Sequence, residues 1–175
     1  MKTIPLLAAA LLTVSLAGAD SADEAFAKGR AAYNAKNPDA ARIHLNNALK
    51  LNPKHPHARY LLNQLSQVED QMRAAQRENA LEGITLPKVA FEETEFSDAI
   101  AGLRQMIETE SKKLHGEDNA YTPNFMITDP TAKLSEKKVS LSLDNVPATT
   151  VLKYLLESAG ATARFDKHAI VIRPK

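Results

Sequence analysis

Residues 139–172 read VSLSLDNVPATTVLKYLLESAGATARFDKHAIVI, and their pattern changes twice along the stretch. Apolar and polar side chains alternate over residues 139–143, which indicates a strand with one buried face. A helix is expected after Pro147, and Gly160 is placed to end it. The residues expected to face inward on this helix are Val151, Leu152, Leu155 and Leu156. The stretch therefore predicts a half-buried strand that leads into a helix.

Strands and helices also alternate on both sides of this stretch. Downstream, residues 163–165 and 169–172 are expected to form a hairpin. Upstream, residues 84–91 begin a strand region, and Thr94 is expected to cap the helix that follows. The inward residues expected on that helix are Phe96, Ala99, Ile100, Leu103, Ile107 and Leu114. A short strand at residues 125–127 completes the order β-α-β-β-α-β-β.

The two halves of this α/β segment resemble each other at an offset of 52 positions. Val89 and Phe91 correspond to Leu141 and Leu143, and the first inward residues of the two helices correspond in the same way. Each half is thus a strand, a turn and a helix that packs on the strand. The predicted fold class is α+β, and its second part is a duplicated split βαβ arrangement with two helices against small sheets.

Residues 22–83 show no strand-like alternation and are rich in helix-forming residues. Ser21 is suited to cap a first helix, and Asn37-Pro38 separates that helix from a second. Asn52-Pro53 ends the second helix, and Pro56 begins a third. The third helix is expected to continue as a connector, because alternating charges along its second half are typical of a solvated helix face.

Small residues stand where the first two helices would cross. Four residues have the mutual spacings of the Gly, the two Ala and the Pro of a tetratricopeptide repeat, and they are Gly29, Ala41, Ala48 and Pro53. Residues 22–65 therefore resemble one such repeat and the first helix of another, although Leu45 replaces the usual Phe and Ala25 the usual Trp. A plain helical hairpin is the alternative.

The resemblance to this repeat implies that the concave side of the first helix carries partner contacts. The positions that it places there are Asp23, Phe26, Arg30, Tyr33 and Asn34. Phe26 and Tyr33 are equally explained as core residues. One repeat is fewer than the roughly three that normally bury a continuous core. The third helix, the second domain or a second copy of the chain must therefore cover the remaining face.

Residues 139–172 also contain an ordered motif, referred to here as a phrase. It consists of a strand, then Asn145-Val146-Pro147, a helix with paired leucines, Gly160 and two further strands. This phrase resembles the short N-terminal domain shared by secretins and TonB-dependent receptors, and Val151 takes the place of the usual Ala. The resemblance covers about residues 86–175 and implies a periplasmic domain that meets partner proteins. Because no pore-forming domain follows, we expect a chain that is not itself the channel or receptor.

The N-terminus has the three parts of a secretory signal peptide. Lys2 supplies a positive charge, residues 4–16 are almost wholly apolar, and Leu16-Ala17-Gly18-Ala19 offers an A-x-A cleavage site. The apolar run is shorter than the ~20 residues that a membrane-spanning helix needs. We therefore expect a signal peptide at residues 1–19, a helical domain at 20–83 and an α/β domain at 84–175. The expected location is the periplasm, or the medium if the host has no outer membrane, with no membrane span in the mature chain.

Composition narrows the classes of partner. The chain has 22 Lys and Arg against 21 Asp and Glu, so removal of the leader with Lys2 leaves a mature chain with no net charge. A neutral chain without Trp argues against nucleic acid as a partner, since such binders carry a cationic excess and often stacking aromatics. The absence of Cys excludes disulfides, a thiol nucleophile and a lipidated N-terminus.

The sequence contains none of the common catalytic or phosphate-binding motifs. His55-Pro56-His57 is interpreted as surface turn residues, because a tetrahedral metal site needs three or four ligands. Glu92, Glu93 and Glu95 lie beside a helix start, where carboxylates commonly favour the helix dipole. We therefore expect a protein that is not an enzyme, with no catalytic residue, no cofactor and no metal.

Binding is expected at the surface, where an unpaired strand edge accepts a partner strand. Phe125 and Ile127 in one short strand, and Ile170 and Ile172 in the last strand, are the candidate edge residues. The function expected is a protein-interaction module, an adaptor or accessory of an envelope assembly of the secretin type. The alternatives are a binder of a small ligand or cell-wall component in an interdomain cleft, and a self-assembling structural protein whose partner is another copy of this chain.

Overall fold

The computed structural model of the chain describes residues 21–175 and is of the α+β class. It begins with helices α1 (Ala22–Asn34), α2 (Pro38–Leu51) and α3 (Pro56–Glu82). The Ser21 hydroxyl accepts a hydrogen bond from the Glu24 amide at 3.1 Å, and the Asn37 side chain accepts one from the Ala40 amide at 3.1 Å. The predicted cap at Ser21 and the predicted break at Asn37-Pro38 are therefore confirmed, and the Asn37 side chain in addition caps α2.

Helices α1 and α2 form a hairpin whose backbones approach closely at Gly29. A Cβ atom at Gly29 would lie 2.8 Å from Leu45 Cγ and 3.1 Å from the Leu45 backbone nitrogen. The helical core consists of small and medium apolar side chains: Ala25, Ala41, Leu45, Ala48, Ala58, Leu65 and Met72. Small residues at the crossing thus let Leu45 fill the space between the helices without a gap.

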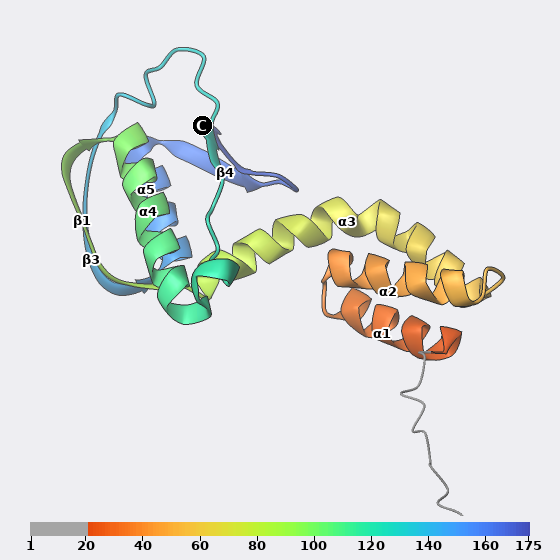
Figure 1. Cartoon of the computed structure of the whole chain (residues 1–175). Coiled ribbons are helices and arrows are strands. Elements are labelled where there is room, and N and C mark those ends of the chain that lie inside the picture. The colour runs from red at the N-terminus through yellow and green to blue at the C-terminus, as the bar shows by residue number, and fades with distance from the viewer. Residues whose placement is uncertain (1–20) are drawn as a thin grey trace, which may run out of the picture.

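Helix α3 belongs to two separate hydrophobic cores. Leu65 and Met72 in its first part pack in the helical core, whereas Leu81 near its end packs in the core of the α/β part. At 27 residues the helix is about 40 Å long, and it connects the two parts without a break (Figure 1). The helix ends at Gly83, whose amide donates to the Asn79 carbonyl at 3.0 Å.

The α/β part has three layers, with two helices between two small sheets (Figure 1). An antiparallel pair of long strands forms the first layer, and a three-stranded sheet of order β2-β5-β4 forms the third. A short 3-10 turn (Glu117–Asn119) follows α4. The elements are β1 (Thr85–Glu95), α4 (Phe96–His115), β2 (Phe125–Ile127), β3 (Lys138–Pro147), α5 (Ala148–Ala159), β4 (Ala161–Phe165) and β5 (Ile170–Pro174). Their order is the one predicted.

The core of this part lies between the two sheets. The predicted inward residues of α4 are buried from Phe96 to Ile107, and so are Val151, Leu152 and Leu155 of α5. Gly160 ends α5 in the left-handed conformation at φ 66°, as expected of a C-terminal glycine. Leu156 is half-buried, and Leu114 is 59 % exposed. The prediction that Leu114 faces inward is therefore wrong, and the buried residues of α4 end at Ser111, one turn before the end of the helix.

Strands β1 and β3 are longer than predicted, and each leads directly into a helix. Thr94 lies in β1, where its hydroxyl donates to the Glu92 carbonyl, and Glu95 is the residue before α4. The predicted cap by Thr94 is therefore wrong. No side-chain hydrogen bond caps α4 or α5, and the Phe96 amide instead donates to the Lys137 carbonyl at 2.8 Å.

The 52-residue offset seen in the sequence reappears in the backbone. Strand β1 pairs with β3 so that Val89 faces Leu143 and Phe91 faces Leu141, which relates the two strands by an approximate two-fold axis. Two non-glycine residues at equivalent positions have positive φ, Glu93 at 45° and Asn145 at 54°. The residues that precede the helices, Glu95 and Pro147, have nearly the same φ and ψ, −60° and 139° against −58° and 144°.

The predicted signal peptide at residues 1–19 lies outside the described residues. Within residues 21–175, no helix combines the length and the apolar character required to cross a membrane.

Candidate functional site

The three-stranded sheet has two edge strands, β2 and β4, with β5 between them. The interpretation of Ile170 and Ile172 as edge residues is therefore wrong. Both side chains are fully buried, because β5 is hydrogen-bonded on both sides and covered by the helices. Phe125 and Ile127 do lie in an edge strand, as predicted.

The backbone of β2 uses only one of its sides within the described residues. The Asn124 carbonyl accepts from the Ile170 amide at 2.8 Å, and the Thr128 amide donates to the Ile172 carbonyl at 2.8 Å. Because successive residues of a strand direct their backbone groups to opposite sides, the amides and carbonyls of Phe125 and Ile127 face away from β5. These four groups are free to pair with a further strand.

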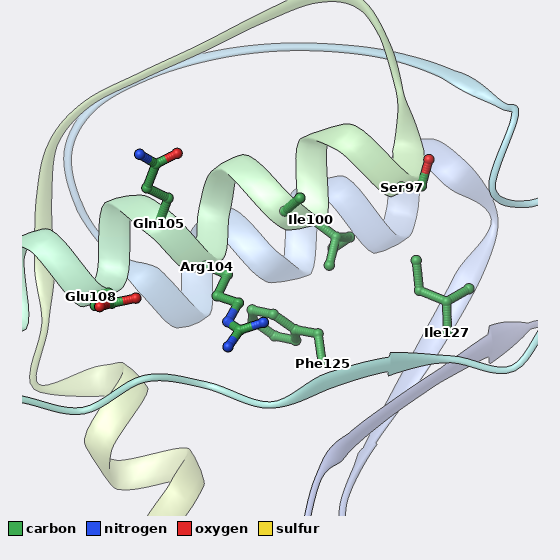
Figure 2. A pocket seen from close by; sticks show the side chains of 8 residues that line it. Ser97, Ile100, Arg104, Gln105, Glu108, Phe125 and Ile127 are labelled. Atoms are coloured by element: carbon green, nitrogen blue, oxygen red, sulfur yellow. The ribbon is translucent and has the colours of Figure 1, made fainter.

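A groove of about 470 Å³ lies along this free edge, between β2 and α4. Ile100 and Ala101 of α4 contribute to its apolar surface, together with the half-buried Phe125 and Ile127 of β2. Figure 2 shows the Ile100 and Ile127 side chains directed toward each other across the groove, which Arg104 and Phe125 also line. The groove thus combines an apolar floor with an unpaired strand edge.

Two charged residues of α4 line the same groove. The carboxylate of Glu108 accepts a hydrogen bond from Lys112 at 3.0 Å and thereby raises the pKa of that lysine. No carboxylate of the described residues forms an ion pair with Arg104. The uncompensated charge in the groove is therefore positive.

The five candidate residues of α1 do not form one site. Asp23 and Phe26 lie near the imidazole of His55. Asp23 Oδ1 is 3.1 Å from His55 Nε2, and the centres of the Phe26 and His55 rings are 5.0 Å apart. The Arg30 guanidinium lies 5.8 Å from the centre of the Phe26 ring. Tyr33 packs against the helical core, and Asn34 is an exposed residue at the end of α1. The structure therefore brings together Asp23, Phe26 and Arg30 alone.

His55 is buried, so its interpretation as a surface turn residue is wrong. Its Nδ1 accepts a hydrogen bond from the Ala58 amide at 3.1 Å, which places the ring proton on Nε2. Nε2 then donates to Asp23, so the imidazole caps α3 and ties it to the start of α1. The signal in the sequence was a polar side chain directly before Pro56, at the position of an N-terminal cap. His57, two residues on, is exposed as predicted.

An ion-pair network between α2 and α3 was also missed. Arg73 donates to Asp39 at 2.7 Å and to Glu69 at 2.8 Å, and Glu69 also accepts from Arg42. The second half of α3 is therefore not only a solvated face, because the charges on it hold α2 in place. Hydrogen bonds from Arg73 lower the pKa values of Glu69 and Asp39 below their ordinary 4.5 and 3.8.

We expect Glu69→Gln to lower the free energy of unfolding at neutral pH by less than about 1 kcal/mol. The reason is that water partly screens this network, in which the Asp39 side chain is 64 % exposed. A carboxylate whose pKa is lowered by folding stabilises the folded state above its ordinary pKa, and this contribution disappears as the pH falls through the folded value. The difference between the variant and the original chain should therefore shrink below pH 4.5. Urea unfolding at several pH values measures it, with the exposed Glu78→Gln on the same helix as the control.

Two of the three acidic residues before α4, Glu93 and Glu95, have structural partners. The Glu93 amide donates to the Ser140 hydroxyl, which donates in turn to the Glu93 carboxylate, and Lys138 donates to Glu95 at 3.0 Å. Within residues 21–175, no three His, Cys, Asp or Glu side chains are grouped so that they could hold a metal ion. Compared with known proteins, the chain matches no family model, no curated protein and no solved structure.

Proposed function

We propose that this chain is a non-enzymatic protein-interaction module that binds a partner by accepting an extended segment along the free edge of β2. The observation that carries the proposal is the coincidence of an unpaired strand edge and an apolar groove at the same place. Main-chain hydrogen bonds to an added strand supply affinity, and pockets for alternate side chains supply specificity. The groove offers both, and Arg104 favours a partner segment that carries an acidic residue.

The partner proposed is a component of an envelope assembly of the secretin type, met in the periplasm. Three observations support this. The phrase Asn145-Val146-Pro147 stands at the β3–α5 junction, and two helices lie between small sheets. The element order also resembles the one expected for the short N-terminal domain of secretins and TonB-dependent receptors. The signal peptide predicted at residues 1–19 supports the proposed location.

The proposal includes a tetratricopeptide-like role for α1, α2 and the start of α3. It is supported by the close packing of Gly29 against Leu45 and by the burial of Ala41 and Ala48. These are the positions at which the family has its small residues. The two helices would present Asp23, Phe26 and Arg30 as a second contact surface, separate from the groove.

The experiment is in-cell crosslinking from β2. A photoreactive residue in place of the exposed Met126 is expected to crosslink to an envelope protein, which mass spectrometry then identifies. Ala101→Arg, which fills the groove with a long charged side chain, should reduce this crosslink by roughly tenfold or more, an effect of about 1.4 kcal/mol.

Ala90→Arg is the matched control, because Ala90 is an exposed residue of β1 outside the groove. It should leave the crosslink unchanged. Equal crosslinking of the two arginine variants would refute the groove as the binding surface. Crosslinks to other copies of this chain alone would replace the adaptor by a self-assembling protein.

A further inference from the structure

A second cavity, of about 610 Å³, lies between the helical hairpin and the α/β part. Four separate segments line it. They are the turn after α1 with Lys36, the second half of α3 with Arg77, the loop before β2 with Tyr121 and Asn124, and the loop between β4 and β5 with His168. The lining includes no Asp or Glu and four basic side chains, which are Lys36, Arg73, Arg77 and His168. We refer to this cavity as the basic cleft.

The positive charges of the basic cleft are not all neutralised. Arg73 is paired with Asp39 and Glu69. Arg77, by contrast, donates its Nη1 to the carbonyls of Arg73 and Asp166, each at 3.1 Å, and no carboxylate of residues 21–175 pairs with it. Two backbone carbonyls thus hold its guanidinium in place and leave its full charge. Lys36 is a turn residue with φ 57°, and its ammonium group adds a second positive charge at the same cleft.

Tyr121 adds a donor that has no acceptor. Its hydroxyl is the one buried side-chain polar atom among the described residues that has no hydrogen-bond partner. Burial raises the pKa of Tyr121 although the charge of Arg77 opposes the effect, so the hydroxyl stays protonated and able to donate at neutral pH. A buried donor without a partner destabilises a protein, and a ligand that supplies the acceptor removes that penalty.

We propose that the basic cleft binds a small organic anion whose carboxylate or phosphate group is held by Arg77 and Lys36 and accepts a hydrogen bond from the Tyr121 hydroxyl. A guanidinium held at one Nη is suited to an oxyanion, because its remaining N–H groups form a fork that matches two oxygens. A small shift of neighbouring side chains, which is common on binding, brings the ligand oxygen to the hydroxyl. This site does not depend on the groove between β2 and α4, with which it shares no lining residue.

The bound anion would contact both parts of the molecule at once. Lys36 belongs to the helical hairpin, whereas Tyr121 and His168 belong to the α/β part. Binding is therefore expected to stabilise the position of the helical hairpin relative to the α/β part.

The test is a titration of the ¹⁵N-labelled protein with sodium acetate and, separately, with inorganic phosphate, with sodium chloride at equal ionic strength as the reference. We expect saturable amide shifts at Lys36, Arg77, Tyr121 and His168 with at least one of the two anions. A response to acetate alone identifies a carboxylate ligand, and a response to phosphate alone identifies a phosphate ligand. Absence of saturable shifts with both would overturn the proposal.

Variants separate a built site from general charge attraction. Arg77→Gln should weaken anion binding at least tenfold, whereas Arg104→Gln, in the other groove, should not change it. Tyr121→Phe should also weaken binding but leave the melting temperature of the anion-free protein unchanged or higher, because it removes only an unpaired hydroxyl. Equal loss in the Arg77 and Arg104 variants, or a lower melting temperature for Tyr121→Phe, would contradict the assignment.

Discussion

Phe96→Ala is expected to lower the free energy of unfolding of the α/β part by about 3–5 kcal/mol, the range for loss of a buried aromatic ring. Phe96 is the largest of the fully buried side chains and stands at the first position of α4. Its amide is also hydrogen-bonded to the Lys137 carbonyl, which keeps this backbone in place while the side chain is removed. The surroundings therefore cannot collapse easily into the cavity, and the loss should lie in the upper part of the range.

Urea unfolding monitored by circular dichroism measures this loss. Tyr154→Ala is the control, since Tyr154 is an aromatic residue of α5 that is 44 % exposed, and its removal should cost far less. Similar losses in the two variants would show that the core does not lie between the two sheets.

Gly29→Ala is expected to destabilise the helical hairpin even though alanine is the better helix former. The added methyl group would lie 2.8 Å from Leu45 Cγ and 2.9 Å from Leu45 Cδ2, and Leu45 is fully buried. Relief requires α1 and α2 to separate, and overpacking of this kind costs about 1–3 kcal/mol. The gain in helix propensity is about 1 kcal/mol, so a net loss of up to roughly 2 kcal/mol remains.

Gly83→Ala is the matched control for this change. Gly83 has φ −71°, and the nearest atom to a Cβ there is the Asn79 carbonyl oxygen at 3.5 Å, an ordinary contact. The same chemical change should therefore be neutral or stabilising by up to about 1 kcal/mol. Thermal unfolding of both variants decides the matter, and a Gly29→Ala protein as stable as the Gly83→Ala protein would contradict the close approach.

Local chemistry was enough to predict most of the elements. The cap at Ser21, the break at Asn37-Pro38 and the glycine at Gly160 that ends α5 each depend on residues within a few positions of each other. The internal repeat was also visible, because equivalent strands and helices bury their apolar residues at the same offset. For the candidate site, Phe125 and Ile127 were predicted as edge residues from the sequence. The sequence did not show that α4 forms the other side of the groove.

The order of strands in a sheet depends on contacts that periodicity does not contain. The error at β5 illustrates this, although the uninterrupted apolar run over residues 169–172 is itself typical of a central, doubly covered strand. Long-range polar contacts were equally inaccessible. Arg73 reaches Asp39, 34 positions away, and His55 reaches Asp23, 32 positions away, so neither pair follows the i, i+4 rule.

Because α3 runs unbroken through both cores, it fixes the angle between the helical hairpin and the α/β part around its own axis. An α-helix turns about 100° and advances about 1.5 Å for each residue. One residue inserted between Met72 and Leu81 would therefore rotate the hairpin by about 100° around the axis of α3, whereas seven inserted residues would nearly restore its orientation at a greater distance. The helix thus holds the two proposed contact surfaces, the groove beside β2 and the surface of Asp23, Phe26 and Arg30, at a set angle to each other, and a partner that engages both would have to match that angle.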